Sequence, residues 1–328
     1  MKKRIIAAGA LFCACLTVVG AGFQTLEQGA ANLGSALAGA TANANGDASA
    51  AFWNASAGFN GLAVGETKVD ICANVILSKF DYVDGPTGVQ SGDAGCTSLI
   101  PNVYIMHRLS EDFLVGLSIS TPYGLETDYE NYWLGCHTAM NSTLITFDIN
   151  PTVAYKISDV LSVHAGLSVQ WIHANLSAVP YYYLPVPNPT AEYLLTGDSW
   201  GLGGNAGFTV NYAEDGRFGF QWRSGVCQKI KGNAHLGGSI TNPIDTELNL
   251  PHSFTVGWYQ RLRGELKKFA LMAEYSYTMW SSFDRLQING TTVNQDESWS
   301  NVSRVAIGGQ RAVYLPEQQG YVPRRRDL

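Results

Sequence analysis

Cationic side chains on the polar faces of predicted strands are the residues of this chain best suited to binding chemistry. Arg223, Arg304 and His164 occupy such positions. A carboxylate that leaves bulk water needs a cation or several hydrogen-bond donors, so these three residues are candidates for binding one. Each also has a simpler role, as an inward-facing charge paired with Asp148 or Glu274. Both interpretations place the three residues on the inner face of a sheet.

Patterns that would support enzyme chemistry are weak in this sequence. Gly201, Gly203 and Ala206 match a loose G-x-G-x-x-A dinucleotide pattern, but the residues around them alternate as on a strand, and no helix is predicted to follow. The six histidines are scattered, and neither a G-x-S-x-G motif nor a pair of metal-binding histidines is present. We therefore predict no catalytic residue, no metal site, no cofactor and no enzyme activity. A lipase or protease site assembled from distant residues stays open as an alternative.

Period-two alternation of apolar and polar residues dominates the chain from about residue 66 onward. Its segments are near ten residues long, the length of a tilted membrane strand with one face in lipid. In residues 161–171 the apolar face holds Leu161, Val163, Ala165, Leu167, Val169 and Trp171, and the polar face holds Ser162, His164, Gly166, Ser168 and Gln170. Comparable patterns occur in residues 145–156, 218–223 and 269–278. A soluble β-sandwich can alternate in the same way, so this pattern alone leaves two folds open.

The N-terminus has the organisation of a secretory signal peptide. Residues 1–4 form a basic start, residues 5–19 are apolar, and Gly20 and Ala21 suit cleavage. The apolar run is too short to span a bilayer, and no later segment has about eighteen uninterrupted apolar residues. Export, alternating strands and aromatic residues at strand ends together favour a β-barrel of the bacterial outer membrane. The net charge of −6 does not indicate nucleic-acid binding, which requires a basic surface.

Small residues crowd the segment that follows, residues 22–57, which is rich in Gly, Ala, Asn and Ser. Such residues let a backbone fold tightly in a confined space but cannot build a core of their own, so we expect this segment to plug the barrel. Short polar links at residues 158–159 and 214–216 are predicted periplasmic turns. The predicted extracellular loops are residues 82–98, 126–141, 178–196 and 231–249.

A series of motifs then runs along the chain: Gly22, Phe23, Gln24 and Glu27; Leu33 and Gly34; Ala38 and Gly39; residues 51–58; Pro101 and Asn102; residues 121–127 (TPYGLET); residues 200–207; residues 248–251; and residues 280–283 (WSSF). Their order and spacing resemble the long-chain fatty acid transporters, the FadL family, which includes the TodX aromatic-hydrocarbon channels. The resemblance covers most of the chain to about residue 310. It implies an all-β fold, an antiparallel transmembrane β-barrel of fourteen strands around an N-terminal hatch.

The resemblance divides the chain into a signal peptide (residues 1–21), a hatch (22–65), barrel strands and loops (66–313) and an irregular tail (314–328). About ten strand candidates can be counted, the last near residues 302–312. The tail has no alternation and ends in Leu328 rather than an aromatic residue. Two interpretations stay open, a family member that is truncated or frame-shifted at its C-terminus and a smaller barrel that closes with ten strands.

The resemblance also implies roles for particular residues. Ligand-binding positions in the hatch are Phe23, Asn54, Ala55 and Ser56, the last three at the place of an Asn-Pro-Ala signature whose proline is missing here. A lateral opening at a kink of the third strand is implied at Tyr123, Gly124 and Leu125, where glycine would tolerate the backbone angles of a bulge. A hydrophobic loop that first contacts ligand is implied at Tyr181, Tyr182, Tyr183 and Leu184, with packing of the loop on itself as the alternative.

The resulting hypothesis is passive outer-membrane transport of long-chain fatty acids or other hydrophobic compounds. Ligand would be captured by extracellular loops, reach a pocket near the hatch and leave sideways through the kinked strand. The alternatives are a structural or adhesion barrel and a non-functional truncated transporter. The expected partners are the hydrophobic small molecule, outer-membrane lipid and the barrel-assembly machinery, with no nucleic acid, and the expected state is a monomer.

Four cysteines lie beyond the signal peptide: Cys72, Cys96, Cys136 and Cys227. An oxidising envelope permits disulfides, and Cys96 and Cys136 would both lie near loops on one side of the barrel. Four small buried thiols are the equal alternative, and the absence of close Cys-x-x-Cys pairs disfavours zinc.

Overall fold

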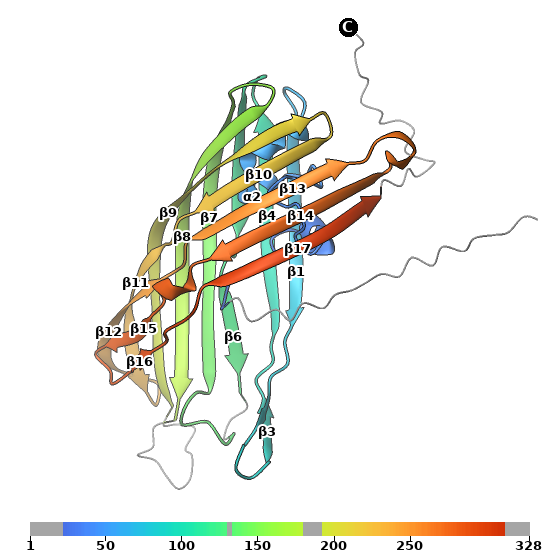
Figure 1. Ribbon diagram of the computed structural model, residues 1–328. Coiled ribbons are helices and arrows are strands. Elements are labelled where there is room, and N and C mark those ends of the chain that lie inside the picture. Colours follow the sequence, from blue (N-terminus) through green and yellow to red (C-terminus); the bar gives the residue numbers. More distant parts are fainter. Residues whose placement is uncertain (1–21, 130–132, 180–191, 312–328) are drawn as a thin grey trace, which may run out of the picture.

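A strongly curved antiparallel sheet wraps around the N-terminal part of the chain (Figure 1). The computed structural model describes residues 22–129, 133–179 and 192–311. Ten strands follow one another across the sheet. They are β1 (Thr67–Leu77), β4 (Thr97–Arg108), β5 (Phe113–Ser120), β7 (Asn141–Lys156), β8 (Leu161–Ala178), β9 (Tyr193–Ala213), β10 (Gly216–Arg223), β13 (Ser253–Arg261), β14 (Phe269–Thr278) and β17 (Val302–Arg311).

Shorter strands extend this sheet at one end. β6 (Gly124–Asp128) pairs with β7, β11 (Cys227–Leu236) pairs with β9 and β12 (Ser239–Asn249), and β15 (Arg285–Asn289) pairs with β12 and β16 (Asn294–Asp296). β2 (Asp81–Val83) and β3 (Gln90–Asp93) form a separate hairpin. The helical elements are α1 (Ala30–Gly34), α2 (Ala50–Trp53), η1 (Ala55–Asn60), η4 (Gly264–Leu266) and η5 (Trp280–Ser282).

The two faces of the long strands differ as the alternation predicts. On β8, Ser162, His164 and Gln170 are buried, while Ala165 and Leu167 on the other face are exposed. Outward apolar side chains are left uncovered across the sheet, up to Ile307 at 82% exposure. This inside-polar, outside-apolar arrangement is the one that lipid around a β-barrel requires, and it excludes a sandwich, whose inner faces are apolar.

The N-terminal segment, called the hatch below, occupies the concave side of the sheet. Its small residues pack closely on the wall, with Ala38, Ala42, Ala48 and Ala57 fully buried. Wall cations donate hydrogen bonds to its backbone carbonyls: Lys68 to Gly46 and Gly61, Arg108 to Leu62, Arg217 to Ala42 and Asn43, and Arg223 to Phe52. These bonds satisfy backbone carbonyl groups of the hatch, most of which lie outside its short helices.

The two ends of the sheet differ in the length of their connections (Figure 1). Tight links join β7 to β8 and β9 to β10 at one end, at the predicted turns 158–159 and 214–216. The prediction of a loop at residues 231–249 is wrong, because this segment forms most of the β11–β12 hairpin. Likewise, residues 193–196 belong to β9. The β11–β12 hairpin reverses the alternation of the wall, because Ile230, Ile244 and Leu248 line the outer cavity while Lys229, Lys231 and Glu247 are exposed. These strands therefore lack the apolar outer face by which wall strands were recognised.

β1 and β17 are the two ends of the ten-strand path, and no pairing joins them among the residues described. No helix in the described ranges is long and apolar enough to cross a membrane. The expected signal peptide and the tail from residue 314 lie outside the described residues.

Candidate functional site

Two cavities of opposite character lie inside the sheet. The outer cavity, on the side of the long loops, has a volume of about 200 Å³. Its lining is mainly apolar, with Asp245 and Glu297 among the polar exceptions. The apolar residues that line it are Phe23, Leu125, Leu144, Ala174, Leu176, Leu195, Ile230, Ile244, Leu248, Phe283, Leu286, Ile288 and Trp299. Such a cavity suits a ligand without charge along most of its length.

The inner cavity is smaller, at about 40 Å³, and polar. Arg223, Arg304 and several hydroxyl and amide side chains line it, together with Phe52 and Trp53 of the hatch. Tyr123 also lines the inner cavity, whereas Phe23 lines the outer one, and their ring centroids are 6.0 Å apart. These two rings form a layer of side chains between the cavities at this point.

Phe23 is the centre of an aromatic cluster in that layer. Its ring centroid lies 4.8 Å from Trp280, 5.7 Å from Trp299 and 6.1 Å from Phe283, all in edge-on geometry. Edge-to-face pairs at these separations stabilise one another beyond simple burial. Trp280, Phe283 and Trp299 were not among the predicted site residues, because the contacts that gather them around Phe23 span more than half the chain.

The third wall strand is interrupted beside this cluster. β5 and β6 both pair with β7, and Thr121, Pro122 and Tyr123 lie between them. Pro122 has no N–H to donate to a strand ladder. The hatch bonds to the interrupted segment instead: Thr25 N donates to Pro122 O at 3.0 Å, and Gly124 N donates to Phe23 O at 2.8 Å.

The predicted lateral-opening residues flank this interruption. Tyr123 is buried, Leu125 is 43% exposed and lines the outer cavity, and Gly124 begins β6. Gly124 does not have a positive φ, and a Cβ added to it would meet nothing closer than the carbonyl of Leu144 at 3.8 Å. Unusual glycine angles are therefore the wrong explanation for the break. Pro122 and the bonds to the hatch account for it.

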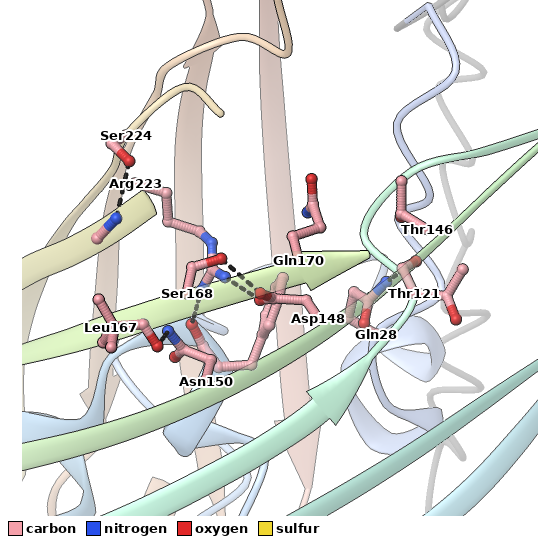
Figure 2. A network of polar contacts seen from close by, with 12 residues as sticks. Gln28, Thr121, Thr146, Asp148, Asn150, Leu167, Ser168, Gln170, Arg223 and Ser224 are labelled. Atoms are coloured by element: carbon pink, nitrogen blue, oxygen red, sulfur yellow. Dashed lines mark hydrogen bonds and ion pairs between the residues drawn. The ribbon is translucent and has the colours of Figure 1, made fainter. Parts of the chain in front are cut away.

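Arg223 reaches from the end of β10 to a carboxylate on β7. Its Nη2 lies 2.8 Å from Asp148 Oδ2, and the side chain of Asp148 is fully buried. Figure 2 shows Ser168 donating a hydrogen bond to the other oxygen of the same carboxylate. Arg223 also lies over the ring of Phe52, 4.2 Å from its centroid, so it joins wall and hatch.

Arg304 forms the second ion pair. Its Nη2 lies 2.8 Å from Glu274 Oε1, and Glu274 Oε2 accepts the backbone N–H of Thr41 at 2.9 Å. Both cations therefore face inward and pair with the two acids named from the sequence. His164 is also buried on the inner face of β8, but it lines neither cavity, and neither ring nitrogen has a hydrogen-bond partner among the described residues.

The predicted ligand-binding positions Asn54, Ala55 and Ser56 also line neither of these cavities. They are almost fully buried where the hatch meets β9. Asn54 Nδ2 donates to Thr41 O, Phe208 O and Thr209 Oγ1 at 2.9, 3.2 and 3.1 Å. These contacts hold the hatch against the wall, whereas Phe23 lines the outer cavity.

The remaining predictions concern the hydrophobic loop, the cysteines and metal binding. Tyr181, Tyr182, Tyr183 and Leu184 lie outside the described residues. Cys72, Cys96, Cys136 and Cys227 are all free thiols, with Cys136 buried in a loop cluster beside Trp133 and Met140. Within the described ranges, no group of three or more His, Cys, Asp or Glu side chains could hold a metal ion.

Comparison with known proteins connects this geometry to one group. A family model described as "Outer membrane protein transport protein (OMPP1/FadL/TodX)" matches residues 11–314. The long-chain fatty acid transport protein of Salmonella typhi is 26% identical over 247 residues, which cover 65% of this chain and 56% of that protein. The 47 kDa outer membrane protein of Pasteurella multocida is 26% identical, with 88% of this chain and 73% of that protein covered.

Solved structures share the fold. A FadL homologue of Pseudomonas aeruginosa superposes with a TM-score of 0.74 at 22% identity, covering 90% of this chain and 78% of that one. The toluene transporter TbuX of Ralstonia pickettii gives a TM-score of 0.63 at 18% identity, with 80% and 77% covered. The chain spans a little more than half the length of the fatty acid transport proteins it matches, 56% for the Salmonella protein.

Proposed function

Because the chain belongs to the outer membrane protein transport family of FadL and TodX, we propose that it moves hydrophobic molecules passively across the bacterial outer membrane. Long-chain fatty acids and other apolar compounds are the proposed cargo. Insertion by the barrel-assembly machinery and function as a monomer complete the proposal. No chemical change of the cargo is part of it.

The observation that carries this proposal is the position of the outer cavity. It lies between the long-loop end of the sheet and the interruption of the third strand, and Leu125 belongs to both. An apolar ligand leaving water gains free energy on entering such a cavity and again on entering lipid. We propose that cargo enters from the loop side and leaves sideways between β5 and β6. A barrel with a purely structural role gives no reason for an apolar cavity beside a break in its wall.

For cargo to reach the break between β5 and β6, residues 23–25 of the hatch must move. Phe23 lines the outer cavity, and backbone bonds from residues 23–25 close the interrupted segment. The side chains of Thr25 and Gln28 add two further hydrogen bonds to Thr121 O. A typical hydrogen bond contributes about 1 kcal/mol, so these bonds can exchange one at a time. We propose that cargo displaces Phe23 and opens the gap. Deleting residues 23–31 should then change uptake, and unchanged uptake by a correctly inserted deletion variant would count against the displacement.

The test of transport is to fill the outer cavity. Ala174 lines it from β8, whereas Ala165 lies exposed on the outward face of the same strand. Ala174→Trp should lower uptake of radiolabelled oleate and toluene at least tenfold, and Ala165→Trp should leave both within twofold of the unmodified protein. Equal uptake by both variants, at matched amounts in the outer membrane, would rule out the cavity as the route.

A further inference from the structure

The inner cavity has cations in its lining, but their charge is already balanced. Arg223 and Asp148 form one ion pair and Arg304 and Glu274 the other, each at 2.8 Å. Both carboxylates are fully buried, so bulk water does not screen them. A ligand that enters this space therefore meets walls whose formal charges cancel.

One strong hydrogen-bond donor at this cavity has no acceptor. Nη1 of Arg304 is buried and makes no hydrogen bond within the part of the chain that the structure describes, although Nη2 of the same group is paired. A buried guanidinium N–H without a partner costs free energy until an acceptor arrives. Because Arg304 is among the residues that line the inner cavity, a small movement of its side chain would offer this N–H to an oxygen atom there.

Hydroxyl groups provide much of the remaining polar lining, beside the amides of Gln24, Gln170 and Gln221. Thr25, Ser168, Ser224, Ser253, Thr255 and Ser276 all contribute to the inner cavity. Thr25 and Ser168 already donate their hydroxyl hydrogens to Thr121 O and Asp148 Oδ1, so they can only accept from an alcohol. Ser224 and Ser253 make no side-chain donation among the described residues and can donate to either an alcohol or a carbonyl oxygen. The space of about 40 Å³ holds two or three water molecules, or one small polar group.

These observations separate neutral polar groups from carboxylates. A carboxylate would add a negative charge that the lining does not compensate, because Arg223 and Arg304 are already paired with Asp148 and Glu274. Burying such a charge costs far more than burying a hydrogen-bonded neutral oxygen. A hydroxyl or ketone oxygen would accept from Arg304 Nη1 and leave both ion pairs intact. The inner cavity therefore favours an oxygen without formal charge.

We propose that the inner cavity binds the neutral oxygen-bearing head of an amphiphile, such as an alcohol or a ketone, whose apolar part lies in the outer cavity. This inference rests on the proposed transport function and names the class of cargo at that site. The two cavities are close enough for one molecule, because Phe23, which lines the outer cavity, contacts Tyr123, which lines the inner one. Displacement of Phe23 joins them.

The experiment compares four ligands of equal chain length on the purified full chain: dodecane, dodecan-1-ol, dodecan-2-one and dodecanoate, each radiolabelled, at neutral pH. The alcohol and the ketone should bind at least tenfold more tightly than dodecanoate and than dodecane. If dodecanoate binds as tightly as the alcohol, the neutral-head inference fails and the transport proposal stands. If dodecane matches the alcohol, the head-group inference fails in the same way. If none of the four binds, both proposals fail.

A double variant tests whether the guanidinium of Arg304 is the hydrogen-bond donor. The double substitution Arg304→Gln with Glu274→Gln keeps a neutral hydrogen-bonding pair and removes Nη1 of the guanidinium. It should weaken binding of the ketone at least fivefold and leave dodecane unchanged. Arg311→Gln, an exposed position on the same strand, is the matched control and should bind all four ligands normally. Equal losses for ketone and dodecane would overturn the assignment of Arg304. The comparison on the unmodified protein stays decisive if the double variant does not insert.

Discussion

Arg304 and Glu274 form an ion pair that also holds the hatch, because the second oxygen of Glu274 accepts the backbone N–H of Thr41 at 2.9 Å. The carboxylate side chain has no exposed surface. The buried carboxylate of Glu274 thus connects β14, β17 and the hatch. Removing either partner of such a pair is costly, since the other charge stays buried without compensation.

Glu274→Gln should therefore destabilise the folded barrel by about 3–5 kcal/mol. Urea unfolding, followed by the loss of the heat-modifiable band on gels, measures this change. Adding Arg304→Gln should recover more than half of the loss, because no unpaired charge then remains. A single variant as stable as the unmodified protein would mean that the pair is not buried in the membrane-inserted state.

Asn54→Ala should reduce stability without changing ligand affinity. The side-chain amide of Asn54 donates to two carbonyls and one hydroxyl where the hatch meets β9, and it lines neither cavity. Leaving buried acceptors unpaired costs about 1–3 kcal/mol each. Unfolding in urea and binding of a labelled ligand should be measured on the same preparation. A loss of affinity in a variant of normal stability would instead assign Asn54 to the ligand site.

The wall of the barrel was predictable from sequence because each strand has one face toward lipid. The alternation at residues 161–171 places Ser162 and His164 inward, as the structure confirms. The same reasoning identified Asp148 and Glu274 as partners for inward cations. Which cation meets which acid depends on sheet register, because Arg223 and Asp148 are 75 residues apart in sequence.

The cavities could not be predicted in this way. The aromatic cluster brings Phe23 from the N-terminal segment against Trp280 and Trp299, and no local pattern encodes that contact. The break after β5 lies at Thr121, Pro122 and Tyr123, and its reason lies in Pro122 and in hydrogen bonds from the hatch rather than in the φ of Gly124. The alternation of apolar and polar residues predicts which face of a strand a residue occupies, but it does not predict packing between distant segments.

Glycine positions on the wall should differ sharply in their tolerance of a methyl group. A Cβ on Gly219 would lie 2.1 Å from the carbonyl oxygen of Thr41 in the hatch, whereas a Cβ on Gly124 has at least 3.8 Å of room. Gly219→Ala should cost about 1–3 kcal/mol of stability by forcing the hatch from the wall, and Gly124→Ala should be nearly neutral. Protease sensitivity of the hatch and the unfolding midpoint test both. Equal behaviour of the two variants would contradict the close approach of hatch and wall at Gly219.

Cys96 should react slowly with alkylating reagents at mildly alkaline pH. Burial and the nearby carboxylates of Glu126 and Asp128 raise the pKa of its thiol, so less of the reactive thiolate is present at any pH below that value. Alkylation of the folded protein, mapped by mass spectrometry over a pH series, should therefore begin to accelerate at a higher pH than alkylation of a small unburied thiol.

Glu126→Gln removes one negative charge and should raise the rate of Cys96 alkylation at pH 8 by about two- to fivefold. Glu111→Gln, at an exposed turn on the opposite end of the sheet, is the matched control. Recovery of Cys96 in a disulfide with Cys136, or a rate unaffected by Glu126, would contradict this account.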